Sequence, residues 1–229
     1  MSATPFRIGM LLFPDITQLD LTGPYEVFTK IPGAEVRLVW KSLDPVRAGG
    51  GMRILPDTIF ADCPQLDLIC VPGGAGMNPL LDDSETLAFI RRQAEAARFV
   101  TSVCTGALVL GAAGLLKGKR ATTHWMSHDM LAAFGAIPVA DRVVVDGNIV
   151  TGGGVTAGID FGLRIAAMIA GEDVAKAIQL GLEYDPAPPF PAGHPRSADA
   201  AIVAAARASA APRQAKRQAA VDAAAAALG

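Results

Sequence analysis

Residues 99–116, FVTSVCTGALVLGAAGLL, join a segment of strand character to a segment of helix character. Phe99 to Ser102 resemble a buried strand, and a helix rich in Ala, Leu and Gly is predicted from Thr105. Cys104 lies at the joint. A thiol there is either a small buried hydrophobe or a nucleophile. The sharp turn directs the side chain outward, and the start of the helix favours a thiolate. This position therefore favours the nucleophile.

Strand-like and helix-like segments alternate on both sides of this joint. The hairpin at 142–151 is predicted from Asp146-Gly147, which lies between β-branched runs. Alternating strands and helices predict a mostly parallel sheet that is covered on both faces. Strands are predicted at 6–13, 34–40 and 67–71, and a short hairpin is predicted near 48–57. Helices are predicted at 17–30, 84–98, 159–170 and 171–184. Pro24 is expected near the first turn of the helix at 17–30.

Composition restricts the class of protein. The chain has 229 residues, of which 51% are hydrophobic, and a net charge of −2, so no strong nucleic-acid field is expected. The odd set Cys63, Cys70 and Cys104 argues against a disulfide framework, and no zinc pattern occurs. The apolar run near the N-terminus is too short for a signal peptide and has no basic start, so we expect none. No apolar run is long enough to span a membrane. We expect a cytoplasmic protein with reduced thiols, no metal and no membrane partner.

The composition changes after Tyr184. Residues 185–195, DPAPPFPAGHP, are expected to be extended, and an Ala-rich segment follows from Ser197. Pro212 is predicted to divide that segment. We therefore expect a domain at 1–184 and an extension at 185–229. The extension is either a frayed tail or a helix packed on another subunit.

A nucleophilic thiol needs a proton partner and donors for a developing charge. In a parallel sheet such groups gather beyond the carboxyl ends of the strands. The VPGGAG turn after the strand at 67–71 can supply backbone donors, notably at Gly74. Asp20 follows the first strand and is either the acid or the cap of a helix beginning near Leu21. Asp15 and Glu26 are competitors, and Glu26 is expected at the surface.

Three histidines are further candidates. A Cys–His pair with His124 is the obvious interpretation, although His124 could instead line the pocket. His128 and His194 have weaker claims. Cys70 lies inside a predicted strand and is interpreted as a core residue, and Cys63 is assigned no role.

Four motifs together resemble the DJ-1/PfpI superfamily over about residues 6–184: SVCTGALVLGAAGLLKGKRATTHW, DLICVPGG, LDLTGPYEVF and GGGVTAGIDFGLRI. The resemblance implies a flavodoxin-like three-layer sandwich of the class I glutamine amidotransferase-like type, and a homodimer. It also implies that Cys104 is the nucleophile and Asp20 its carboxylic partner. Many members carry glutamate where Asp20 stands, and the shorter acid is similar to the isonitrile-hydrating branch. Thr105 matches a residue implicated in that branch, and His124 is left as a pocket residue.

The activity implied by this resemblance is hydration of a small-molecule isonitrile to an N-substituted formamide, through a cysteine thioimidate and without a cofactor. Other cysteine chemistry on the same elbow, as in a glyoxalase or an amide hydrolase, is the first alternative. A non-enzymatic ligand or redox sensor is the second. Similar motifs occur in the sensor half of AraC-type regulators. The tail here lacks a plausible pair of DNA-binding helices, so no nucleic-acid partner is expected.

Overall fold

The computed structural model describes residues 4–229 and centres on a seven-stranded sheet. The strand order is β10-β11-β7-β6-β1-β2-β5, and all neighbours pair in parallel except β10 with β11. This is the mostly parallel α/β sheet predicted from the alternating pattern. The strands are β1 (Phe6–Leu11), β2 (Ala34–Trp40), β5 (Thr58–Ile59), β6 (Leu68–Val71), β7 (Phe99–Val103), β10 (Val143–Asp146) and β11 (Ile149–Gly152).

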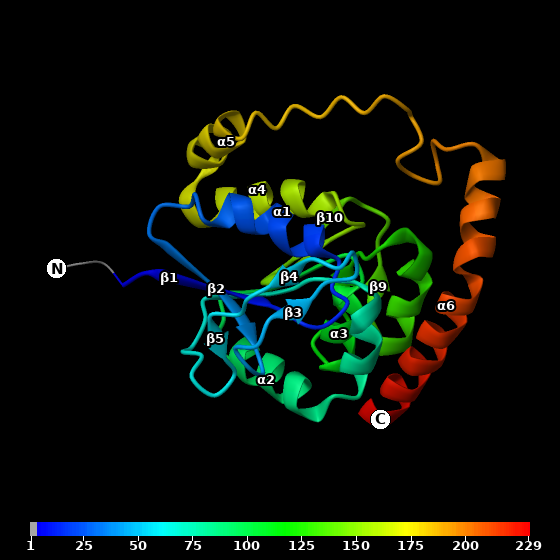
Figure 1. Ribbon diagram of the computed structural model, residues 1–229, viewed down its shortest axis with the longest axis horizontal. Coiled ribbons are helices and arrows are strands. Elements are labelled where there is room, and N and C mark those ends of the chain that lie inside the picture. The colour runs from blue at the N-terminus through cyan, green and yellow to red at the C-terminus, as the bar shows by residue number, and fades with distance from the viewer. Residues whose placement is uncertain (1–3) are drawn as a thin grey trace.

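Helices cover both faces of the sheet, as the three-layer prediction requires (Figure 1). One face carries α1 (Gln18–Phe28), α4 (Ala157–Ala170) and α5 (Glu172–Gly181), and the other carries α2 (Ser84–Ala94) and α3 (Gly106–Ala112). Short ribbons and two 3-10 helices complete the fold. They are β3 (Val46–Arg47) with β4 (Arg53–Ile54), β8 (Arg120–Ala121) with β9 (Ile137–Pro138), η1 (Ala75–Leu81) and η2 (Trp125–Phe134).

The predicted joint between strand and helix is present. β7 ends at Val103, α3 begins at Gly106, and Cys104 has a φ of 55°. A positive φ is strained for a residue with a side chain, and such residues occur at nucleophile elbows. Gly106 makes the sharp turn feasible, because a Cβ at that position would overlap the carbonyl oxygen of Val71.

Two sequence expectations about proline are wrong. Pro24 lies well inside α1 rather than near its first turn, and its ring packs closely against α4 at Gly158. Pro212 does not divide the Ala-rich segment, because α6 runs unbroken from Ala200 to Leu228. An internal proline costs a helix about 3 kcal/mol. In α6 the buried residues Ala210 and Arg217 lie on either side of Pro212, so packing on both sides of the proline supports the continuous helix.

The Ala-rich helix α6 lies against its own chain, where it contacts η1, η2 and α3 (Figure 1). The segment between α5 and α6 contains neither helix nor strand and crosses from one side of the molecule to the other. The boundary at Tyr184 and a role of residues 185–229 in a dimer stay predictions. None of the described helices is both long and apolar enough to cross a membrane.

Candidate active site

The backbone of Cys104 is held on both sides. Its N–H lies 3.0 Å from the Gly152 oxygen and 2.9 Å from the Gly153 oxygen, and donates to both. Its carbonyl oxygen accepts a 2.6 Å hydrogen bond from the hydroxyl of Thr123. These contacts fix a residue whose positive φ is unfavourable by itself. The side chain is therefore presented in one orientation.

The Cys104 sulfur is buried and receives backbone donors. The residue is 5% exposed, and the N–H groups of Thr105 and Val155 donate to the sulfur. Burial, and then the charge of Asp20, raise the pKa of the thiol to about 12, and the two N–H groups act in the opposite direction. The elbow thus supplies the donors expected from the sequence, but burial outweighs them. The resting group is the thiol, and a thiolate forms only if another group takes the proton.

Asp20 lies in the first turn of α1 and is completely buried. Its Oδ2 accepts the N–H of Gly73 at 3.0 Å, whereas its buried Oδ1 has no hydrogen-bond partner among residues 4–229. An interaction with the Cys104 side chain acts to lower the pKa of Asp20. Burial raises the pKa of Asp20 to about 7. Thr17 occupies the N-cap position, so the alternative in which Asp20 caps the helix is wrong. The carboxyl group is placed to exchange a proton with the thiol.

The turn after β6 connects Asp20 to Thr105. Gly73 donates to Asp20, and Gly74 donates to the hydroxyl of Thr105 at 3.1 Å. A Cβ at Gly73 would lie 2.8 Å from Asp20 Oδ2 and 2.5 Å from the Thr105 nitrogen, so only glycine fits. The Gly74 N–H, which the sequence suggested as a donor to substrate, is therefore already used. The N–H groups of Thr105 and Val155 point to the sulfur instead.

His124 forms no Cys–His pair among the hydrogen bonds of residues 4–229. It precedes η2, and its Nδ1 accepts the N–H of Met126 at 3.3 Å. Burial, together with the positive charges of Arg217 and Arg213, lowers the pKa of His124 to about 4. Its ring lies beside Gly154, next to the Val155 donor. His124 thus lies beside the elbow as a neutral side chain, and its role as a pocket residue stays a prediction.

The remaining candidates lie elsewhere. Asp15 is exposed, and Glu26 is exposed and pairs with Lys30 at 2.7 Å. Cys70 is buried in β6, as predicted for a core residue, and Cys63 is half-buried. His128 is paired weakly with Asp129, and His194 lies near Arg196. Among residues 4–229, no three His, Cys, Asp or Glu side chains form a group that could hold a metal ion.

Sequence reasoning missed two residues of the site. Val155 reaches Cys104 through its backbone N–H, for which a side-chain pattern gives no signal. Arg217 of α6 is 5% exposed and lies near enough to interact electrostatically with Cys104. Arg217 lies in the Ala-rich segment after Ser197, in which the sequence analysis singled out no site residue. A buried position on a helix of small residues could not be recognised from hydrophobic periodicity.

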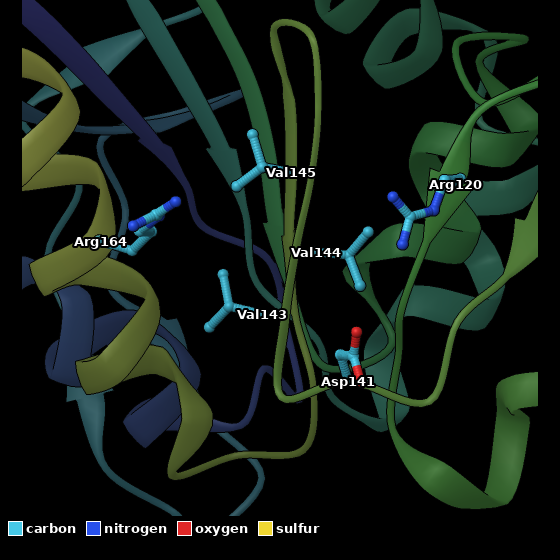
Figure 2. Close-up of a pocket in the computed structure, with 6 residues that line it drawn as sticks. All are labelled: Arg120, Asp141, Val143, Val144, Val145 and Arg164. Atoms are coloured by element: carbon cyan, nitrogen blue, oxygen red, sulfur yellow. The ribbon is translucent and has the colours of Figure 1, made fainter.

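Two surface hollows lie away from Cys104. One, of about 360 Å³, surrounds β10, and Figure 2 shows Arg120 and Arg164 on opposite sides of that strand. The other, of about 390 Å³, lies between α5 and the segment after α1 and is lined in part by Pro32 and Ile178. Neither is lined by Asp20 or Cys104. The candidate site is therefore the buried pair of the Cys104 thiol and the Asp20 carboxyl group.

A strand-elbow cysteine beside a buried carboxyl group, at the carboxyl edge of a parallel sheet, defines a class of cysteine-centred α/β proteins. The DJ-1/PfpI family model matches residues 6–168, and the chain belongs to this family. It is 62% identical to the isonitrile hydratase of Pseudomonas putida over 206 residues, which are 90% of each chain. It is also 32% identical to the HTH-type transcriptional regulator GbdR of Pseudomonas aeruginosa over 79% of this chain, but spans only 51% of that regulator.

Solved structures agree with this assignment. A ThiJ/PfpI family protein from Pseudomonas syringae has a TM-score of 0.93 and 45% identity, and the match covers 95% of this chain and 90% of that one. DJ-1beta of Drosophila melanogaster has a TM-score of 0.71 and 24% identity over 78% of this chain and 98% of its own. The second match concerns the fold alone. Both confirm the predicted family fold.

Proposed function

We propose that this protein is an isonitrile hydratase, which adds water to R–N≡C and releases an N-substituted formamide. The observation that carries the proposal is the 62% identity, over 90% of both chains, to the Pseudomonas putida enzyme. The buried pair of Cys104 and Asp20 is suited to this chemistry, because the terminal carbon must gain a nucleophile and a proton in one step.

In the first step the proton of the Cys104 thiol passes to Asp20, and the thiolate attacks the isonitrile carbon. The Asp20 carboxylic acid protonates the same carbon as the C–S bond forms. The product is a thioimidate, R–N=CH–S–Cys104. The N–H groups of Thr105 and Val155 stabilise the thiolate before attack. Asp20 ends the step as a carboxylate.

In the second step water adds to the thioimidate carbon and one proton moves to nitrogen, giving R–NH–CH(OH)–S–Cys104. The C–S bond then breaks, the carbonyl forms, and the hydroxyl proton returns to the sulfur. The released product is R–NH–CHO, and Cys104 and Asp20 are restored. Thr105 positions the pair through its hydroxyl, which is tied to Gly74. His124, neutral at physiological pH, lines the site.

We further propose that the protein works in the cytoplasm as a homodimer with no nucleic-acid partner. Its cysteines Cys63, Cys70 and Cys104 are all free, which suits a reducing compartment. The similarity to the regulator covers only about half of that protein's length. A second chemistry on the same elbow is a glyoxalase, since the chain is 26% identical to glyoxalase DJR-1.2 of Caenorhabditis elegans.

Product analysis with a simple alkyl isonitrile tests the proposal, with methylglyoxal and a simple amide as competing substrates. We expect formamide from the isonitrile and no turnover of the other two. Cys104→Ser should abolish formamide release, whereas Cys63→Ser and Cys70→Ala should keep it within about threefold of wild type. Turnover of methylglyoxal alone would assign the site to the second chemistry. Isonitrile turnover by a folded Cys104→Ser variant would contradict the assignment of Cys104 as the nucleophile.

A further inference from the structure

The C-terminal helix α6 carries a buried cation without an acidic partner. Arg217 is 5% exposed, and it forms no ion pair among residues 4–229. Its Nε donates to Asn78 Oδ1 at 3.2 Å, and its Nη1 donates to Ser127 Oγ at 3.0 Å. Both partners are neutral. A buried charge without a counter-charge is costly, so a positive charge here suits a site where negative charge develops.

Arg217 bridges the two segments that flank the elbow. Asn78 lies in η1, just after the Gly73–Gly74 turn that holds Asp20 and Thr105. Ser127 lies in η2, and its N–H donates to the carbonyl oxygen of His124, the residue after the Thr123 that holds Cys104. The same helix contacts α3, which begins two residues after Cys104. The guanidinium therefore joins the two 3-10 helices whose preceding segments hold Asp20 and Cys104.

An electrostatic attraction connects Arg217 with the Cys104 sulfur. Burial lowers the pKa of Arg217, and its attraction to the Cys104 thiolate opposes this effect. Burial raises the pKa of Asp20, and interactions with Cys104 and Gly73 act to lower it. A positive charge at Arg217 thus favours the charged form of the Cys104 sulfur.

Other charged and titratable groups also act on this site. Arg213 of α6 is exposed and adds a weaker positive charge, and His124 is neutral at physiological pH. Cys70 of β6 interacts with Asp20, but burial raises its pKa to about 12, so it stays neutral. Among these groups, Arg217 is the buried permanent charge and Asp20 the buried acid. The charge balance of the pair therefore depends chiefly on these two residues.

We propose that Arg217 is a positioning residue of the active site, whose buried guanidinium favours the arrangement with a Cys104 thiolate and a protonated Asp20. One proton moves from sulfur to carboxylate, and the net charge of the pair does not change. The proposal rests on the roles assigned to Cys104 and Asp20 in the proposed function. It adds a part of the chain, α6, that lies beyond the residues matched by the family model.

Alkylation of Cys104 by iodoacetamide tests this without any isonitrile. The rate is measured at pH 7 to 9 by mass spectrometry of the Cys104 peptide. Arg217→Gln should slow alkylation about tenfold at each pH, as expected for a rise of about one pKa unit. Arg217→Lys keeps the charge and should stay within about threefold of wild type. Arg213→Gln, on the same helix and exposed, is the matched control and should change little.

Ser127→Ala separates charge from packing, because it removes a hydrogen bond of the guanidinium and keeps the charge. It should also stay within about threefold of wild type. Two results would overturn the proposal: faster alkylation in Arg217→Gln, or alkylation in Ser127→Ala that is slowed as much as in Arg217→Gln. Either would mean that Arg217 only holds α6 in place by packing and hydrogen bonds. Should Arg217→Gln not fold, a tenfold loss in Arg217→Lys or Ser127→Ala would overturn it as well. Because no isonitrile is used, this result is independent of whether the enzyme hydrates isonitriles.

Discussion

The hydroxyl of Thr123 donates a 2.6 Å hydrogen bond to the carbonyl oxygen of Cys104. Thr123 lies on the chain between β8 and η2, and Cys104 follows β7, so this bond connects the elbow to a separate part of the molecule. Both residues are buried, and Cys104 has a positive φ. The orientation of Cys104 thus depends on a neighbour outside its own strand and helix.

Thr123→Val should lower the free energy of unfolding by about 1–3 kcal/mol, because a buried carbonyl loses its donor. It should also lower kcat/KM about tenfold, since the elbow loses a restraint. Thr101→Val is the control. It removes a buried hydroxyl that donates to the Ile69 oxygen at 2.9 Å, on the strand before the elbow. The control should lose similar stability in urea denaturation but keep its activity within about threefold.

Asp20→Asn should lower kcat/KM by about 100-fold or more, because an amide cannot carry the proton from sulfur to carbon. In the wild type, kcat/KM should rise with pH up to about 7 and then level off. Below that pH Asp20, whose pKa is about 7, already holds a proton and cannot take the one on Cys104. A pH–rate series on both proteins checks this. An Asn variant with wild-type rates, or a wild-type profile that falls as pH rises through 7, would contradict it.

Asp20 should also make stability depend on pH. Its pKa is about 7 in the folded state and 3.8 as a model value, so between these values the folded state binds the extra proton. Stability must then fall as pH rises from about 4 to 7, and this loss is complete above 7. Urea denaturation at several pH values should show this fall in the wild type relative to Asp20→Asn. Parallel curves for the two proteins would contradict the raised pKa.

Val221 is completely buried on α6 and belongs to the hydrophobic core. Val221→Asp should detach the helix, because a buried carboxylate without a partner is strongly unfavourable. We expect a lower melting temperature and faster alkylation of Cys104, which loses its cover. Ile202→Asp, on the same helix at a position that is 53% exposed, should change neither. Unchanged alkylation in a Val221→Asp variant with a lowered melting temperature would show that α6 does not cover the thiol.

The extension at 185–229 is expected to support a homodimer. A chain that ends at Tyr184 should sediment with a weaker dimer than the full chain, or melt at a lower temperature. The full chain should not bind DNA at low salt, where a basic surface would bind most strongly. If the truncated chain keeps the dimer strength and the melting temperature of the full chain, the extension does not contribute to the interface. Salt-sensitive DNA binding that disappears on truncation would instead favour a role like that of the regulators.

Local features of the sequence predicted the elbow but not its surroundings. The run from β7 through Cys104 to α3 has its pattern within a few adjacent residues, including Gly106, which the turn requires. Asp20 was ambiguous, because an acid before apolar residues suits a cap and a catalytic role equally. Its position was decided by the Gly73 N–H, which belongs to a neighbouring strand's turn.

The sequence by itself determined the α/β class, the position of the elbow cysteine and the family, because strand and helix periodicity and the elbow are local patterns. The tertiary structure alone decided which groups surround the sulfur. Val155 and Arg217 act on Cys104 from distant parts of the chain, one through its backbone N–H and the other through its charge on an Ala-rich helix. It also decided that the thiol is the resting form, since burial depends on every segment that covers the site.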